Sequence, residues 1–310
     1  MQKDKIQFFQ NVILNWYSKN KRDLPWRTTT DPYKIIVSEI MLQQTQVDRV
    51  IPKYQKFLET FPTIEALEKA PLSQVIELWA GLGYNRRAVN LQAMAKQVTE
   101  EYQGRMPKRI EQLQTLKGIG PYTASAVACF AFAQDVPVID TNIRRIMDRY
   151  YGNEERSGKQ REQITFENTK KSVPNGKGVA WNNALMDFGS LVCTAKNPQC
   201  ASCPLKNDCN FFRELQTLTP EQQKKIFETT KKQPSFKHST RYYRGQILKL
   251  IRENKTIEEE IVLTHILKEE KLDKTTAKKL IQDLMNDQLL EKNNTKLQLP
   301  QHAITHCRKI

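Results

Sequence analysis

The chain has 310 residues, enough for about two domains, and its 49 Lys and Arg residues against 34 Asp and Glu residues give a net charge of +15. No apolar run approaches the ~20 residues of a membrane span, and the charged N-terminal segment is unlike a signal peptide. These features argue against a membrane or exported protein and favour the reducing cytoplasm. The positive charge favours a polyanionic partner, usually nucleic acid, over Lys residues that merely aid solubility.

Helical periodicity dominates the chain up to about residue 213. A first helix is expected over residues 1–27, where Pro25 interrupts the pattern. A second is expected over 32–61, with a kink near Pro52. Gly and Pro residues separate the shorter helices that follow. The pattern predicts an all-α body.

The composition changes after residue 213. Residues 214–240 are polar and predict a linker. Residues 241–300 predict three helices, the third of them capped by Asp273, followed by a hairpin around Asn293-Asn294. This set of elements predicts a small winged-helix domain, which leaves 301–310 as a tail.

Two local patterns carry possible chemistry. The stretch LKGIGPYTASA (116–126) places two glycines between helices, where backbone N–H groups and the next helix N-terminus can hold a phosphate. A plain helix corner with a Gly cap explains the same pattern. Asp140 precedes another predicted helix, where an aspartate is most often only an N-cap.

Four cysteines stand in the spacing C-x6-C-x2-C-x5-C. In a reducing compartment this cluster favours a metal site over disulfides. Four thiolates suit an iron–sulfur cluster, and zinc would also accept them. A zinc-dependent base deaminase is excluded, since it needs a His-x-Glu pair and no histidine precedes His238. The four candidate ligands are Cys193, Cys200, Cys203 and Cys209.

Taken together, the hairpin, the aspartate and the cysteines resemble the helix-hairpin-helix DNA glycosylases. Within that family, RDLPWR (22–27), PYKIIVSEIMLQQTQV (32–47) and WAGLGYNRRAVNL (79–91) are similar to the MutY-type adenine glycosylases. The resemblance covers residues 1–213 and implies a two-lobed all-α fold with a [4Fe-4S] cluster on the four cysteines. The lobes would be 28–137, and 1–27 together with 138–213. The resemblance does not extend to the usual C-terminal domain that reads 8-oxoguanine, which we therefore expect to be missing.

The resemblance implies a mechanism of base excision. Glu39 would protonate the leaving adenine, with the apolar Ile36, Val37 and Ile40 raising its pKa. Asp140 would stabilise the oxocarbenium-like sugar. Tyr122 stands where strand-cleaving relatives carry lysine, so we expect a monofunctional glycosylase that acts on adenine opposite guanine or 8-oxoguanine.

The resemblance also assigns binding roles. Asn142 would line the catalytic site with Tyr122. Arg22, Leu24 and Trp26 would surround the extruded base, although a helix-end ion pair and core packing explain them equally well. The remaining expected contacts are Asn183 near the base, Gln43, Gln44 and Tyr84 in the gap left in the duplex, and Lys117, Gly118, Gly120 and Thr123 on a phosphate.

Two other functions stay open at this point. One is a mismatch glycosylase that removes thymine or uracil opposite guanine. The other is a non-catalytic iron–sulfur regulator that binds DNA through its winged tail, against which the presence of Glu39 and Asp140 argues. The expected partner is mismatched double-stranded DNA, with no membrane, and the expected form is a monomer in the cytoplasm, associated with the nucleoid.

Overall fold

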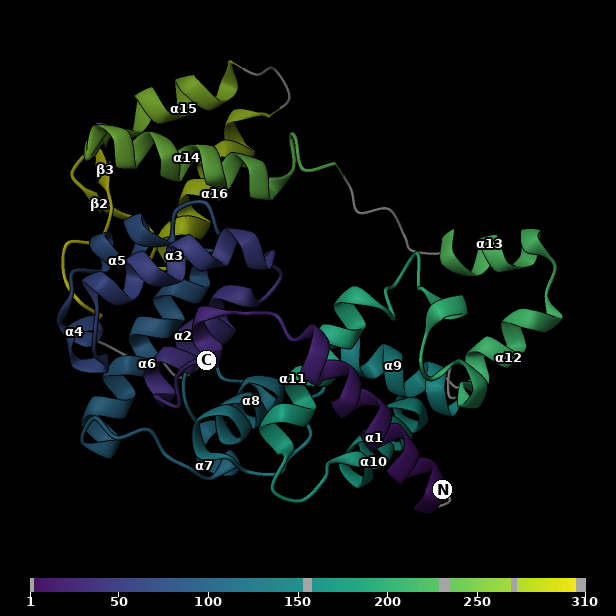
Figure 1. Ribbon diagram of the computed structural model, residues 1–310. Coiled ribbons are helices and arrows are strands. Elements are labelled where there is room, and N and C mark those ends of the chain that lie inside the picture. The colour runs from purple at the N-terminus through teal and green to yellow at the C-terminus, as the bar shows by residue number, and fades with distance from the viewer. Residues whose placement is uncertain (1–2, 153–157, 229–234, 269–271, 305–310) are drawn as a thin grey trace. The chain divides into compact units, whose positions relative to one another are not determined.

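The computed structural model describes residues 3–152, 158–228, 235–268 and 272–304 (Figure 1). The chain divides into two compact units. Unit 1 contains Met1–Pro32, Lys108–Ile110 and Gly120–Lys231, and unit 2 contains Tyr33–Pro107, Glu111–Ile119 and Lys232–Ile310. Almost all regular structure is helical, which confirms the predicted all-α body. The predicted boundary at residue 137 differs from this division, because residues 120–137 lie in unit 1.

Unit 1 is built around a helix that is apolar on one side and begins directly after Asp140. Its buried face meets the first and eleventh helices of the chain, where Phe9 stacks on Tyr150 with ring centroids 4.4 Å apart and Trp181 packs edge-on against Phe9. The elements of the unit are α1 (Lys3–Asn20), η1 (Pro25–Arg27), α8 (Pro121–Phe132), α9 (Thr141–Tyr151), α10 (Gly158–Ser172), α11 (Gly178–Leu191), η2 (Cys200–Ser202), η3 (Lys206–Asp208), α12 (Asn210–Thr217) and α13 (Pro220–Glu228).

The helices of unit 2 that precede the hairpin pack around a separate apolar core, in which Phe57, Trp79 and Met94 are fully buried. They are α2 (Pro32–Leu42), α3 (Val47–Thr60), α4 (Ile64–Lys69), α5 (Leu72–Trp79), α6 (Arg86–Tyr102) and the short α7 (Ile110–Leu113).

The single helix predicted over 32–61 is wrong in one respect. The chain leaves the helix after Leu42 and resumes it at Val47, and Gln44 between them has a left-handed φ of 54°. Pro52 lies inside α3. The prediction placed Gln43 and Gln44 on the same helix as Glu39. They lie instead in the turn that follows it.

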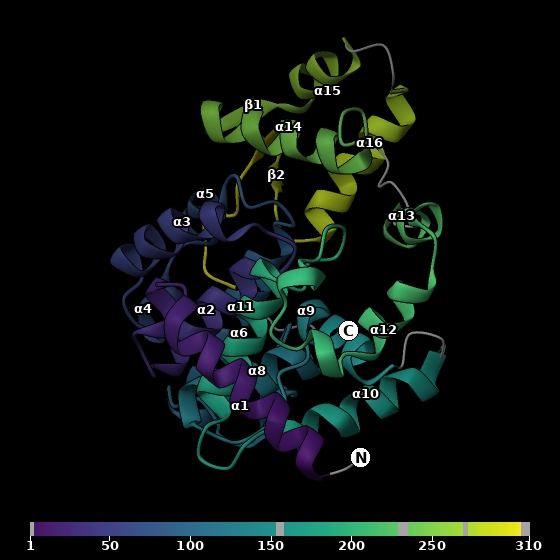
Figure 2. The same ribbon diagram turned by 45° about the vertical axis from the view of Figure 1, so that its right-hand side comes forward.

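The C-terminal part of unit 2 contains the three helices and the hairpin that were predicted, together with a further strand, β1, that was not (Figure 2). Asp273 caps its third helix by accepting a hydrogen bond from the Thr276 N–H at 2.9 Å. An antiparallel sheet of order β1-β3-β2 pairs Ile257 with Leu297, and Leu297 with Lys292. The elements are α14 (Thr240–Asn254), β1 (Thr256–Glu258), α15 (Glu259–Leu267), α16 (Lys274–Asn286), β2 (Glu291–Asn293) and β3 (Lys296–Gln298).

The predicted linker is not irregular throughout, because it contains the end of α12 and the whole of α13. Part of the predicted tail is ordered against unit 2, where the N–H groups of Leu72 and Ser73 donate to the carbonyls of His302 and Pro300. Residues 305–310 of that tail lie outside the described residues. None of the described helices combines the length and apolar character that a bilayer span requires.

Candidate active site and metal centre

Glu39 is a carboxylate inside an apolar helix. It lies in α2 of unit 2 and is only 6% exposed, and its neighbours Ile36, Val37 and Ile40 are buried with it. The apolar surroundings that were predicted for Glu39 are therefore present, and its role as an acid stays a prediction.

The turn after α2 and the glycine loop before α6 are tied together by one side chain, Arg87. Its guanidinium donates to the carbonyls of Ile40 and Gln43 at 2.7 and 2.6 Å. The same group donates to the carbonyls of Leu82 and Gly83 at 3.2 and 3.0 Å. Carbonyls at the C-terminal end of a helix have no partner within the helix, and Arg87 supplies one for α2. Burial lowers the pKa of Arg87 to about 10, so it stays charged at neutral pH.

The two loops bound by Arg87 each present one exposed residue, Gln44 or Tyr84, in an unusual backbone conformation. Gln44 and Tyr84 have φ values of 54° and 45°, a region that non-glycine residues seldom occupy. Tyr84 is 42% exposed, and the centroid of its ring lies 5.7 Å from the Arg87 guanidinium carbon. Of the residues predicted to fill the gap in the duplex, Gln44 and Tyr84 are thus exposed and fixed from one anchor, while Gln43 is partly buried. Sequence reasoning missed Arg87, although it stands three residues after Tyr84.

The predicted phosphate hairpin has the expected backbone. Gly118 has a φ of 76°, and a Cβ added there would lie 2.9 Å from the Asn90 Cβ, so glycine is required on both grounds. The N–H groups of Gly118 and Gly120 donate to no acceptor within the described part of the chain. The Lys117 N–H, by contrast, donates to Gln97 Oε1 at 3.0 Å. Thr123 is buried, which differs from the exposed position expected of a phosphate contact.

Asp140 caps helix α9 of unit 1. Its Oδ1 accepts the Ile143 N–H at 2.7 Å, and its Oδ2 accepts the Asn142 side-chain amide at 2.8 Å. Burial raises the pKa of Asp140, although these hydrogen bonds partly oppose the effect. The carboxylate is therefore fixed in orientation and carries a raised pKa, a combination typical of functional sites. The structure places the Asn142 amide against Asp140, and the roles of both residues in the reaction stay predictions.

The segment that leads to Asp140 is held by Asn182, which sequence reasoning missed. Its Oδ1 accepts the Val138 N–H at 2.9 Å, and its amide donates to the Val136 carbonyl at 3.0 Å. Asn182 is fully buried, whereas the neighbouring Asn183 that was predicted near the base is partly exposed. Tyr122 packs against a small apolar cluster that includes Val138. The role of Asn183 stays a prediction.

Arg22 takes part in a buried ion pair. Its Nε lies 2.6 Å from Asp187 Oδ1, and Arg27 contacts Oδ2 of the same carboxylate at 2.8 Å. Burial alone would raise the pKa of Asp187, but hydrogen bonds and charge from these arginines lower it. Leu24 and Trp26 are buried. The ion pair of Arg22 and the burial of Leu24 and Trp26 thus explain these residues structurally, as the alternative interpretation of the sequence expected. Their contact with a base stays a prediction.

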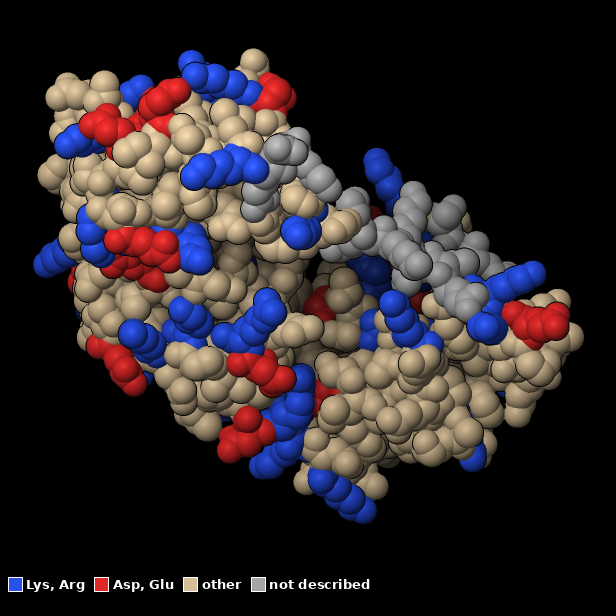
Figure 3. All heavy atoms as spheres, turned by 90° about the horizontal axis from the view of Figure 1, so that it is seen from above, with Lys and Arg blue, Asp and Glu red and all other residues tan. Residues whose placement is uncertain are grey.

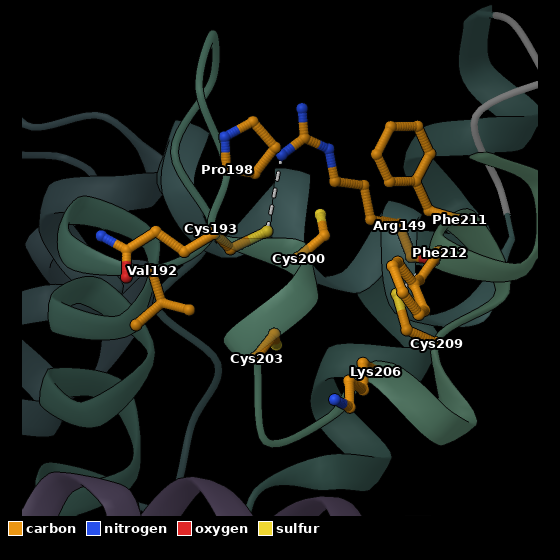
Figure 4. A pocket seen from close by; sticks show the side chains of 11 residues that line it. Arg149, Val192, Cys193, Pro198, Cys200, Cys203, Lys206, Cys209, Phe211 and Phe212 are labelled. Atoms are coloured by element: carbon orange, nitrogen blue, oxygen red, sulfur yellow. Dashed lines mark hydrogen bonds between the residues drawn. The ribbon is translucent and has the colours of Figure 1, made fainter. Parts of the chain in front are cut away.

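The four cysteines line one pocket of unit 1 (Figure 4). The pocket holds about 320 Å³ of empty space, part of it open to solvent. Burial raises the pKa of Cys203 to about 12 and that of Cys209 to about 11. Thiolates in such a pocket require a compensating cation. The pocket is lined by Cys193, Cys200, Cys203, Cys209, Arg149, Val192, Pro198, Gln199, Lys206, Phe211 and Phe212.

The chemistry of the lining residues can be compared with the two metals that the sequence left open. All four candidate ligands are cysteines, and the remaining described residues that line the pocket include no histidine or carboxylate. Four thiolates are the usual ligands of an iron–sulfur cluster, although Zn²⁺ also accepts them. The residues therefore fit a [4Fe-4S] cluster.

Helix α9 connects the cysteine pocket to Asp140. Arg149 donates to the Cys193 sulfur at 3.5 Å and to the Thr194 carbonyl at 2.8 Å (Figure 4). Arg145, one turn earlier, donates to the Cys193 carbonyl at 2.7 Å and to Asn142 Oδ1 at 2.8 Å. Asn142 in turn binds Asp140. One helix thus carries a continuous set of hydrogen bonds from the cysteine loop to the carboxylate.

Comparison with known proteins agrees with this geometry. Residues 37–172 match the model of the HhH-GPD superfamily base excision DNA repair proteins. Residues 193–209 match the iron–sulfur binding domain of endonuclease III, which confirms the predicted cluster. The chain is 40% identical over 205 residues to an adenine DNA glycosylase of Buchnera aphidicola subsp. Baizongia pistaciae, a match that covers 66% of this chain and 58% of that protein.

A second relative is matched over almost its whole length. This thymine/uracil-DNA glycosylase of Methanothermobacter thermautotrophicus is 32% identical over 214 residues, which cover 69% of this chain and 97% of the relative. A solved thermostable thymine-DNA glycosylase has a TM-score of 0.65 and 32% identity over 68% of this chain and 98% of its own. By contrast, the chain spans 58 and 61% of two adenine glycosylases of Buchnera that it matches. From the cysteine pocket, the hairpin and these matches, the chain belongs to the HhH-GPD superfamily of base excision DNA repair proteins.

Proposed function

We propose that this protein is a monofunctional DNA glycosylase that removes adenine mispaired with guanine or 8-oxoguanine. The observation that carries the proposal is Glu39, a carboxylate buried in an apolar helix. Adenine leaves as a poor anion unless it is protonated, so its release needs a positioned acid. The likeness to an adenine DNA glycosylase of Buchnera supports the same substrate.

The proposed reaction begins with extrusion of the adenosine from the duplex, because its glycosidic bond cannot be reached inside the stack. Gln44 and Tyr84 occupy the vacated space. Glu39 gives its proton to the purine as the C–N bond breaks, and Asp140 stabilises the positive charge that develops on the sugar. Water then adds to the sugar carbon and leaves an abasic site, and the proton that the water loses returns to the Glu39 carboxylate. Since Tyr122 offers no amine, no Schiff base forms with the sugar and the backbone stays intact.

A second candidate is removal of thymine or uracil opposite guanine. It is favoured by the match to a thymine/uracil-DNA glycosylase over 97% of that protein's length. Single-turnover base release on A:G, A:8-oxoG, T:G and U:G duplexes separates the two candidates. We expect release from the two adenine duplexes and none from the others. Release of thymine or uracil alone would overturn the first proposal.

Under this proposal Arg87 is a positioning residue. Replacing it with Ala leaves the carbonyls at the end of α2 without their partner and releases both the Gln44 turn and the Tyr84 loop. We expect single-turnover base release to fall about 100-fold, the loss typical of a displaced site. The Arg87→Lys variant keeps the positive charge but loses the planar guanidinium that donates to several carbonyls at once. We therefore expect it to recover only part of the wild-type rate of base release.

Arg105→Ala is the matched control for Arg87→Ala, because this arginine is exposed in the same unit. It should release base at the wild-type rate. Melting curves of both variants report whether the unit remains folded. An Arg87→Ala protein that retains the wild-type rate would show that the two loops do not need this anchor.

A further inference from the structure

The C-terminal domain, residues 235–304 as described, reaches the Tyr84 loop through Arg241. Its guanidinium donates to the Tyr84 hydroxyl at 2.9 Å, and the guanidinium carbon lies 5.9 Å from the centre of the Tyr84 ring. The two residues are 157 positions apart in the sequence, and both belong to unit 2. Arg241 is exposed in the first turn of α14.

Neighbouring contacts hold the domain in this place. Asp287, just after α16, contacts Arg244 of the domain at 2.5 Å and Arg86 of α6 at 2.8 Å. At the other end of α14, Lys255 pairs with Glu77 at 2.8 Å. The carbonyls of Pro300 and His302 complete the attachment at the start of α5. These contacts attach the C-terminal domain to the rest of unit 2 and so keep the start of α14, which carries Arg241, beside the Tyr84 loop.

Arg241 has no acidic partner in the described part of the chain, unlike several other basic residues of the same domain. Lys249, Lys274, Lys292 and Lys296 of the domain each pair with a glutamate. Figure 3 shows the same mixture, with Lys and Arg side chains lying among Asp and Glu on the face drawn. Among the residues that the structure describes, no carboxylate forms an ion pair with Arg241. Its charge is thus available to a ligand.

We infer that Arg241 makes the C-terminal domain part of the DNA-binding surface, by binding a backbone phosphate next to the nucleotide gap that Tyr84 fills. This inference rests on the proposed function for the place of Tyr84 in the duplex. Phosphates follow each other every 3.4 Å along the axis of a strand. If the Tyr84 ring lies between base pairs, Arg241, which is bonded to the Tyr84 hydroxyl, lies within reach of a backbone phosphate. Its planar guanidinium can donate to two phosphate oxygens at once.

The test is an affinity measurement that requires no chemistry. The full-length protein is titrated with a duplex containing a tetrahydrofuran abasic analogue opposite guanine, at several salt concentrations. Arg241→Gln should raise Kd about tenfold, the size expected for one charge-assisted phosphate contact. The slope of log Kd against log salt should fall by about 0.9, as for one phosphate neutralised. Arg241→Lys, which keeps the charge, should restore most of the slope.

Lys249→Ala is the matched control, because Lys249 lies about two turns further along the same helix and removing it changes the charge equally. It should leave Kd within twofold. The inference is wrong if Arg241→Gln binds like wild type, if its salt slope is unchanged, or if it binds more tightly, as it would if Arg241 held Tyr84 in a closed state. Melting curves identify a variant that fails to fold, in which case Arg241→Met, which also removes the charge, replaces Arg241→Gln and is judged by the same affinity and salt slope.

The same experiment separates this inference from the proposed function. If wild-type protein releases no base from any duplex but Arg241→Gln still weakens binding, the phosphate contact stands and the proposed chemistry fails. If adenine is released and Arg241→Gln changes neither affinity nor salt slope, the chemistry stands and the inference fails.

Discussion

The Glu39→Gln variant should release adenine from an A:G duplex at least about 1000-fold more slowly than the wild type. The amide fills the same buried space in α2 but has no proton to give to the leaving purine, and general acids contribute roughly 100- to 10 000-fold. Asp140→Asn should lose about as much. The asparagine oxygen can still accept the Ile143 N–H, but it carries no charge to stabilise the sugar cation.

Both variants should keep the fold, the visible absorbance of the cluster and the affinity for abasic DNA, so that the loss is one of chemistry. Single-turnover release under saturating enzyme measures it. A Glu39→Gln protein with near wild-type rates would refute the acid assignment. A normal rate for Asp140→Asn would equally refute the role of the carboxylate.

The pH dependence of base release gives an independent check on Asp140. Burial raises the pKa of this carboxyl above its ordinary value of 3.8, against the opposing hydrogen bonds from Ile143 and Asn142. The proposed role needs the ionised form, so the rate should fall as the pH drops through the raised pKa. The acidic limb should thus lie above pH 3.8 and be absent from the residual activity of Asp140→Asn. An identical limb in that variant would assign it to another group.

Replacing Cys203 with Ser should remove the cluster and destabilise unit 1. The side chain is one of four thiols around the pocket, and binding of a structural metal centre is coupled to folding. If the free energy of unfolding falls by about 4 kcal/mol, Tm falls by roughly 10 °C. The visible absorbance of the cluster should disappear in the same variant. Absorbance spectra and melting curves together measure both effects.

Cys129→Ala provides the control for Cys203→Ser. Cys129 is fully buried in α8, away from the other cysteines, and packs with Ala126 and Val138. This variant should lose some stability through the small cavity but keep its colour. If Cys203→Ser kept both absorbance and Tm, the assignment of the four ligands would be wrong.

The parts of the fold that local sequence signals specify were predictable. Asp140 and Asp273 cap the helices that they were expected to start. The break between α2 and α3 was not predictable from its own residues. At this break, Arg87 donates a hydrogen bond to the Gln43 carbonyl, although the two residues are 44 positions apart in the sequence. The periodicity of the segment QQTQV cannot indicate a hydrogen-bond partner so far away in the chain.

The same distinction holds for the site. The cysteine ligands were found because fixed spacing within one loop is enough to hold a cluster. Asn182 was missed, and its neighbour Asn183 was chosen instead. The sequence cannot tell which of two adjacent amides faces inward, because that depends on how α11 packs against the segment before Asp140. Arg145 and Arg149 were missed for a similar reason, since their acceptors lie in the cysteine loop.

Helix α9 limits how this sequence can change during evolution. Its first turn orients Asp140, its later turns aim Arg145 and Arg149 at the cysteine loop, and Tyr150 fills the core. Deleting one residue from its middle would rotate everything beyond the deletion by about 100°. Homologues should therefore differ here by substitution and never by length, while insertions accumulate in the loops on either side.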